Sequence, residues 1–247
     1  RKTFLAVEDN KQDAIRRMRE IIDPESDIDL AVVATRYPQG SEKQLIEAIT
    51  RREVPIGGLP IDVGVVVQNV ATAAAAAEAV IGGIPLISRI VTVTGRNINH
   101  PGNFEVRIGT PFSDLISLAG GYRGRVRKVI MGGPMMGIAV YTDRVPVIKG
   151  TSGILVPHDK EIRYYQPQPC IRCGKCLEVC PMRLSPGRFI DFTEDQEFDK
   201  ALEKNILNCM ECGACTYICP ARRPMVQWIK LAKAQIRQRK ASREKVK

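Results

Sequence analysis

The stretch C-I-R-C-G-K-C-L-E-V-C-P at Cys170–Pro181 is repeated in form as C-M-E-C-G-A-C-T-Y-I-C-P at Cys209–Pro220. All eight cysteines of the chain lie in these two runs, four in each. Both runs have the spacing C-x2-C-x2-C-x3-C-P, which is typical of proteins that bind cubane iron–sulfur clusters. The two runs therefore predict a domain that holds two [4Fe–4S] clusters.

The spacing also predicts which cysteines share a cluster. Three thiolates spaced three residues apart can bind one cluster, whereas the fourth cysteine, next to a proline, ligates the other cluster in two-cluster ferredoxins. We therefore expect crosswise ligation between the runs. The first cluster is assigned Cys170, Cys173, Cys176 and Cys219, and the second is assigned Cys209, Cys212, Cys215 and Cys180.

Three other interpretations of the cysteines compete with this one. Structural zinc sites usually pair two C-x2–4-C units and need neither a third cysteine at i+6 nor a closing Cys-Pro. A disulfide framework suits a small secreted domain rather than a chain of 247 residues. Coincidence is excluded because the full spacing occurs twice.

Composition limits the class of protein further. Hydrophobic residues make up 44% of the chain, enough for a core, whereas aromatic residues make up 5%, which argues against nucleic-acid folds that stack bases. No cysteine remains for a structural disulfide, so a reducing compartment such as the cytoplasm is expected. We find neither a signal peptide nor an apolar run of about 18 residues, so no transmembrane segment is expected.

The two histidines, His100 and His158, have no partner at ligand spacing, and no catalytic residue is assigned.

Positive charge is concentrated at the C-terminal end. The net charge is +10, and residues 222–247 hold ten Lys or Arg and one acid. This block is either a solvated tail or a surface for an acidic partner or an anionic membrane face.

Apolar patterning divides the chain into five segments. Strand–helix alternation over residues 1–85 predicts an α/β domain with a parallel sheet, and residues 86–140 read as a small α+β module. Residues 141–164 form a β-rich linking segment, residues 165–224 an α-helical ferredoxin-type domain, and residues 225–247 a basic helical tail. The expected strands are Thr3–Val7, Ile28–Thr35, Val63–Val67, Arg89–Thr94, Phe104–Ile108 and Val126–Met131. The expected helices include Lys11–Ile22, Val70–Ile81, Phe112–Ala119, Gly187–Phe192, Phe198–Leu207 and Met225–Ile236, the last with Ile229 and Ala232 inward and Lys230 and Lys233 outward.

Four further motifs accompany the cysteine runs. They are Y-P-Q-G-S-E-K-Q-L at Tyr37–Leu45, Q-N-V-A-T at Gln68–Thr72, G-G-P-M-M-G at Gly132–Gly137 and K-G-T-S-G-I-L at Lys149–Leu155. With these motifs in this order, the chain resembles the RnfC family, the C subunits of the Rnf (Rsx) electron-transport complexes. The resemblance covers essentially the whole chain.

The resemblance implies a fold and a set of flavin contacts. Residues 1–85 are similar to the Rossmann-like flavin domain of the complex I flavoprotein, and residues 86–140 to its β-grasp module. By position, the FMN/NADH site then includes Tyr37, Gly40, Glu42 and Asn69. The family's glycine-rich phosphate loop lies upstream of these segments and has no counterpart here. Because the chain begins at Arg1 within a strand-like run, we expect further upstream residues, which FMN binding would require.

The resemblance also implies a function. Members pass electrons between NADH or ferredoxin and membrane partners, at the cytoplasmic side of the inner membrane, and couple this transfer to Na⁺ or H⁺ movement. We expect a peripheral electron-transfer subunit of such an oxidoreductase, without a nucleic-acid partner. The alternatives are a cobalamin reductase of propanediol utilisation, which has a similar layout, and a zinc-stabilised binding module.

The charges within the two runs predict different cluster potentials. Arg172 and Lys175 lie between the ligands of the first run, where the second has Glu211 and Ala214. Positive charge stabilises the reduced, more negative cluster, so the cluster with three first-run ligands should have the higher potential. Arg172→Glu should lower this potential in a redox titration, and an unshifted potential with intact clusters would contradict the prediction.

Overall fold

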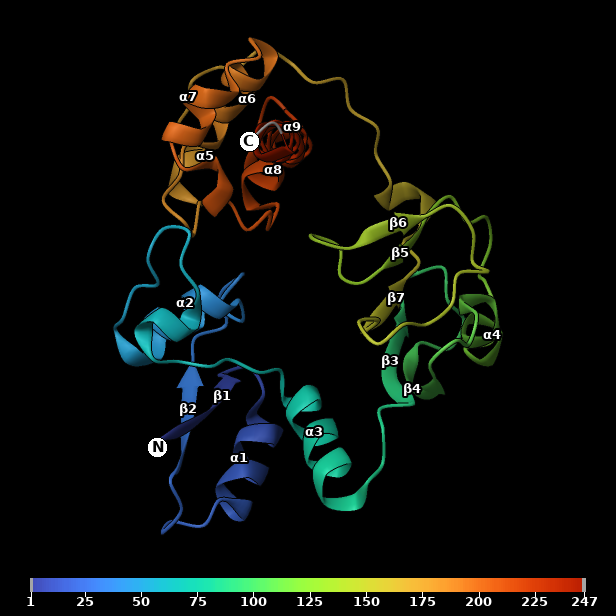
Figure 1. Ribbon diagram of the computed structural model, residues 1–247. Coiled ribbons are helices and arrows are strands. Elements are labelled where there is room, and N and C mark those ends of the chain that lie inside the picture. Colours follow the sequence, from blue (N-terminus) through green and yellow to red (C-terminus); the bar gives the residue numbers. More distant parts are fainter. Residues whose placement is uncertain (1, 246–247) are drawn as a thin grey trace. The chain divides into compact units, whose positions relative to one another are not determined.

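The computed structural model describes residues 2–245, which divide into two compact units, one up to residue 68 and the other from residue 69 onward. Figure 1 labels the helices and strands.

The first unit is built on a parallel strand pair. Strands β1 (Thr3–Glu8) and β2 (Ile28–Val33) pair in register, and helix α1 (Gln12–Ile21) connects them (Figure 1). The Asp9 carboxylate, just after β1, accepts hydrogen bonds from the backbone N–H and the hydroxyl of Thr35 at 3.0 and 2.6 Å. These bonds lower the pKa of Asp9 and tie together the ends of the two strands. Helix α2 (Glu42–Thr50) follows and buries Ile46.

One strand expected in this unit is wrong. In place of a strand at Val63–Val67, the structure has a 3₁₀ turn, η1 (Pro60–Val63), followed by irregular backbone. The turn forms because Asp62 accepts the N–H of Leu59 and because Gly64 adopts the left-handed conformation at φ 72°. Val66 is 72% exposed, so apolar composition alone did not place this segment in a sheet.

The second unit begins with the alanine-rich helix α3 (Val70–Gly82), as expected. The side chain of Asn69 caps it by accepting the N–H of Ala71 at 3.0 Å.

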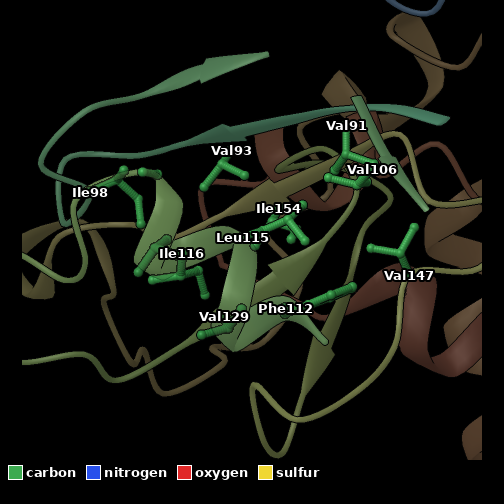
Figure 2. Close-up of a cluster of buried hydrophobic side chains, with 12 residues drawn as sticks. Val91, Val93, Ile98, Val106, Phe112, Leu115, Ile116, Val129, Val147 and Ile154 are labelled. Atoms are coloured by element: carbon green, nitrogen blue, oxygen red, sulfur yellow. The ribbon is translucent and has the colours of Figure 1, made fainter. Parts of the chain in front are cut away.

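A five-stranded sheet follows in the order β4-β3-β7-β5-β6. Strands β3 and β4 pair antiparallel, whereas β3 and β7 pair parallel although more than fifty residues separate them. Helix α4 (Phe112–Leu118) packs its buried side chains into the core of this module (Figure 2). The strands are β3 (Ser88–Thr94), β4 (Gly102–Arg107), β5 (Val129–Met131), β6 (Ile138–Val140) and β7 (Gly153–Leu155).

The segment that sequence patterning treated as a link after residue 140 contributes to this core. Val147, Ile154 and Val156 are fully buried there, together with Val91 and Leu115 (Figure 2 labels all but Val156). β7 lies between β3 and β5. The packing of the module therefore extends to Val156.

The remainder of the second unit is helical. Helix α9 packs against α6 and α7, and helix α5 contacts α8 (Figure 1). The core between α6, α7 and α9 includes Phe189, Phe198 and Ile229. The bounds are η2 (Asp159–Glu161), α5 (Lys175–Glu178), α6 (Pro186–Glu194), α7 (Phe198–Glu203), η3 (Ile206–Asn208), α8 (Ala214–Ile218) and α9 (Met225–Lys245).

Two differences from the expected helices stand out. The helix expected over Phe198–Leu207 is divided at Asn205, which adopts the left-handed conformation at φ 62°. α9 runs beyond Ile236 to Lys245, so the described part of the basic tail is helical.

Among the residues that the structure describes, no helix combines the length and the apolar composition that a bilayer span requires.

Two leucines of helix α4 test how the core of the sheet module is packed. Leu115 is fully buried in α4, whereas Leu118 on the same helix is 67% exposed. Leu115→Ala should destabilise the module by about 2–5 kcal/mol because it leaves a cavity. Leu118→Ala, the matched control, should change its stability by less than about 0.5 kcal/mol. Amide hydrogen exchange in β3 and β7 measures both, and equal effects of the two variants would contradict the packing described.

Candidate metal centres

The two cysteine runs form the same local structure twice. In each, a glycine in the left-handed conformation, Gly174 at φ 76° or Gly213 at φ 84°, precedes a short helix, α5 or α8. In each, the residue two after the first cysteine also has positive φ, at Arg172 and Glu211. The N–H groups of Arg172 and Glu211 each donate to the sulfur of that first cysteine at 3.4 Å.

The four cysteines around each hollow come from both runs. One hollow, of about 660 Å³, is lined by Cys170, Cys173, Cys176 and Cys219. The other, of about 20 Å³, is lined by Cys180, Cys209, Cys212 and Cys215. These are the two sets that the cysteine spacing predicts, so the fold brings each predicted set together.

The thiols are not arranged around a single ion. Within residues 2–245, no three His, Cys, Asp or Glu side chains are close enough together to hold one metal ion. The thiols of each run nevertheless interact electrostatically, as Cys209, Cys212 and Cys215 do. Four thiolates spread around one hollow suit a multi-metal cluster, whose ligands bind different metal atoms.

The two hollows differ in their exposure to solvent. Cys170 and Cys173 are exposed, whereas Cys212 and Cys215 are buried. Burial, together with the neighbouring thiols, raises the pKa of Cys215 to about 12, and burial also raises the pKa of Cys209. Because metals bind thiolates, loading the buried hollow must release protons from these thiols.

Backbone donors surround the sulfurs of both hollows. Besides the N–H groups described above, the N–H of Leu184 donates to the sulfur of Cys180 at 3.3 Å. Burial raises the pKa of Cys176 and of Cys215, and backbone hydrogen bonds at Gly187 and Thr216 oppose this rise in part. Hydrogen bonds to sulfur are among the factors that set cluster potentials.

One lysine contradicts the sequence-based prediction. Lys233 of α9 was expected to point outward, but its side chain is only 6% exposed. Its Nζ donates to the carbonyl oxygen of Cys209 at 2.5 Å and to Oε1 of Glu211 at 2.8 Å. The spacing of α9 already places Lys233 on the buried stripe, four residues after Ile229 and three before Ile236, but the prediction assigned it to solvent because of its charge. Its partners lie 24 and 22 residues earlier in the chain, and only the tertiary fold brings them near. Lys230 is 56% exposed, as expected, and lies 3.8 Å from Glu211.

Three families match successive parts of the chain. Residues 1–78 match the Nuo51 FMN-binding domain, residues 90–139 the SLBB domain and residues 162–220 a 4Fe-4S dicluster domain.

Relatives that match nearly the whole chain point to one kind of protein. The chain is 48% identical, over 95% of its length, to the C subunit of the Na⁺-translocating ferredoxin:NAD⁺ oxidoreductase complex of Acetobacterium woodii. It is 46% identical, over 96% of its length, to the C subunit of the proton-translocating complex of Clostridium ljungdahlii, and 45% identical to the C subunit of the ion-translocating complex of Citrobacter koseri. The chain is a homologue of RnfC.

This RnfC homologue spans 53%, 52% and 34% of those three relatives, about half of the first two. A solved NAD⁺-reducing [NiFe]-hydrogenase in the H2-reduced state has a similar fold, with a TM-score of 0.56. The match covers 94% of this chain and 49% of that chain at 17% identity, which supports the fold alone.

The expected flavin contacts lie in different units. Tyr37 and Gly40 belong to the turn before α2, and Glu42 is the first residue of that helix. Asn69 belongs to the second unit, where its side chain caps α3. Their role toward FMN or NADH stays a prediction.

The difference in burial predicts the order in which the thiols of this chain react with an alkylating reagent when no metal is bound. Iodoacetamide should modify the exposed Cys170 and Cys173 first and Cys215 last, because the thiolate is the reactive form. The rate at Cys215 should continue to rise as pH increases from the ordinary pKa of 9.0 toward 12. Time-resolved mass spectrometry measures these rates. Equal rates at Cys173 and Cys215 would contradict the burial described.

Proposed function

We propose that this chain is the electron-relay part of an RnfC protein that transfers electrons between NAD(H) or FMN and other subunits of a membrane complex. The relatives named for ferredoxin:NAD⁺ oxidoreductase complexes support this proposal. The observation that carries it is the gathering of the eight thiols into two crosswise sets of four.

We assign a [4Fe–4S] cluster to each set. Cys170, Cys173, Cys176 and Cys219 would hold the first cluster, and Cys209, Cys212, Cys215 and Cys180 the second. When bound, such clusters supply one-electron carriers. The match to a 4Fe-4S dicluster domain favours this assignment over a zinc-stabilised module, and the names of the relatives favour it over a cobalamin reductase.

The protein around each set has a distinct task. Leu184, Phe189, Val226 and Ile229 line the hollow of the second set and exclude water from it. The exposed thiols of the first set open this side to a partner. Because α5 contacts α8, both sets belong to one helical body, which keeps them near each other for electron transfer.

The remaining domains would supply the nucleotide side of the reaction. We assign a Rossmann-like flavin-type fold to the first domain and a β-grasp fold to the sheet module, on their matches to the Nuo51 FMN-binding and SLBB families. FMN or NADH would contact Tyr37, Gly40, Glu42 and Asn69, and the protein would be peripheral on the cytoplasmic face of the membrane. In anaerobic protein that includes the upstream residues, NADH should bleach bound FMN, and Glu42→Ala should abolish this bleaching.

Serine variants test the crosswise ligation. Anaerobically purified chain should contain about eight irons with matching sulfide. Electron paramagnetic resonance of the reduced protein should show the same altered cluster in Cys219→Ser as in Cys173→Ser. Likewise, Cys180→Ser should match Cys212→Ser.

Two results of these experiments would contradict the proposal. If Cys219→Ser instead resembles Cys212→Ser, each cluster draws its ligands from a single run. If the unsubstituted chain binds zinc and lacks sulfide, the electron-relay proposal is wrong.

A further inference from the structure

A buried cation beside the second set of thiols has no role in the electron relay proposed above. Lys233 lies on α9 between Ile229, Ala232 and Ile236, which are 1%, 0% and 4% exposed, and its own side chain is 6% exposed. Lysine is rarely buried to this extent unless it is paired, because removing its charge from water costs several kcal/mol. Its position in an apolar core therefore calls for specific partners.

Both partners of Lys233 belong to the loop that carries the second set. The ammonium donates to the carbonyl oxygen of Cys209 and to Oε1 of Glu211. Glu211 is 28% exposed, and its N–H donates to the sulfur of Cys209 at 3.4 Å. Lys233 thus connects α9 to a predicted cluster ligand through two neighbouring contacts.

The first run has the opposite charge at the same place. Arg172 occupies the position of Glu211 and is exposed. In the second run, Glu211 forms an ion pair with Lys233 of helix α9. The pairing keeps a carboxylate next to the ligand loop without leaving its negative charge uncompensated.

We propose that Lys233 is a positioning residue for the second cluster, which offsets the charge of Glu211 and so raises the potential at which this cluster accepts an electron. The inference rests on the proposed function. Reduction adds one electron from a low-potential donor, with no bond made or broken, and makes the cluster more negative. A nearby ammonium in a poorly hydrated core favours this state more strongly than an exposed one does.

Variants of the anaerobic, cluster-loaded chain test the proposal. Lys233→Met keeps the apolar stem and removes the charge. In a redox titration followed by electron paramagnetic resonance, the reduced-to-oxidised ratio of the second cluster at a fixed potential should fall about tenfold, which is a shift of about 59 mV for one electron. The first cluster should titrate as before.

Lys230→Met is the matched control. It removes the same charge from the same helix, at 3.8 Å from the same carboxylate, but Lys230 is 56% exposed. Because water and salt screen exposed pairs, the ratio should change by less than about twofold. Lys233→Arg, which keeps the charge, should stay closer to the unsubstituted chain than Lys233→Met.

A double variant separates charge from packing. Lys233→Met combined with Glu211→Gln removes both charges and should return the potential of the second cluster toward that of the unsubstituted chain. If Lys233→Met alone loses iron, recovery of iron and potential in the double variant supports the proposal. A double variant that stays without the second cluster overturns it, because Lys233 then serves packing alone.

An iron-replete Lys233→Met with an unshifted second cluster also overturns the inference and leaves the electron-relay proposal intact. Absence of iron and sulfide from the unsubstituted chain would instead remove the proposed function itself.

Discussion

The exchange of the fourth cysteine between the two runs is the constraint on which the helical part of the chain depends. Cys219 lies with the thiols of the first run and Cys180 with those of the second. Neither set is complete without the other run, so the two loops must be held at a defined separation. The contacts of α5 with α8 and of α9 with α6 provide this.

The sheet module satisfies a constraint of a different kind. Its core closes when β7 enters between β3 and β5, after a long excursion through α4, β5 and β6. Val147, Ile154 and Val156 then complete a core that contains Phe112 and Leu115. Local patterning recognises each of these strands or apolar stretches, but it carries no information on which strand pairs with which. The module therefore extends beyond the boundary near residue 140 that patterning predicts.

The features that could be predicted from the sequence were those with a strong local pattern. Repeated cysteine spacing predicts the two sets of thiols that line the two hollows, and periodic apolar residues predict α3, α4, α6 and the first part of α9. The strand predicted at Val63–Val67 was wrong because β-branched composition does not determine whether a partner strand is present. The prediction for Lys233 was wrong because it followed the charge of the residue rather than its position on the apolar stripe of α9, four residues after Ile229. Its burial depends on Glu211, which only the tertiary fold brings near.

The unequal exposure of the thiols has a consequence for the handling of such a protein. Cys170 and Cys173 face solvent, whereas Cys212 and Cys215 are enclosed by apolar side chains. If each set holds a cluster as proposed, dissolved oxygen has a shorter path to the first set than to the second. Aerial damage of a cluster-loaded chain should then begin at the first set.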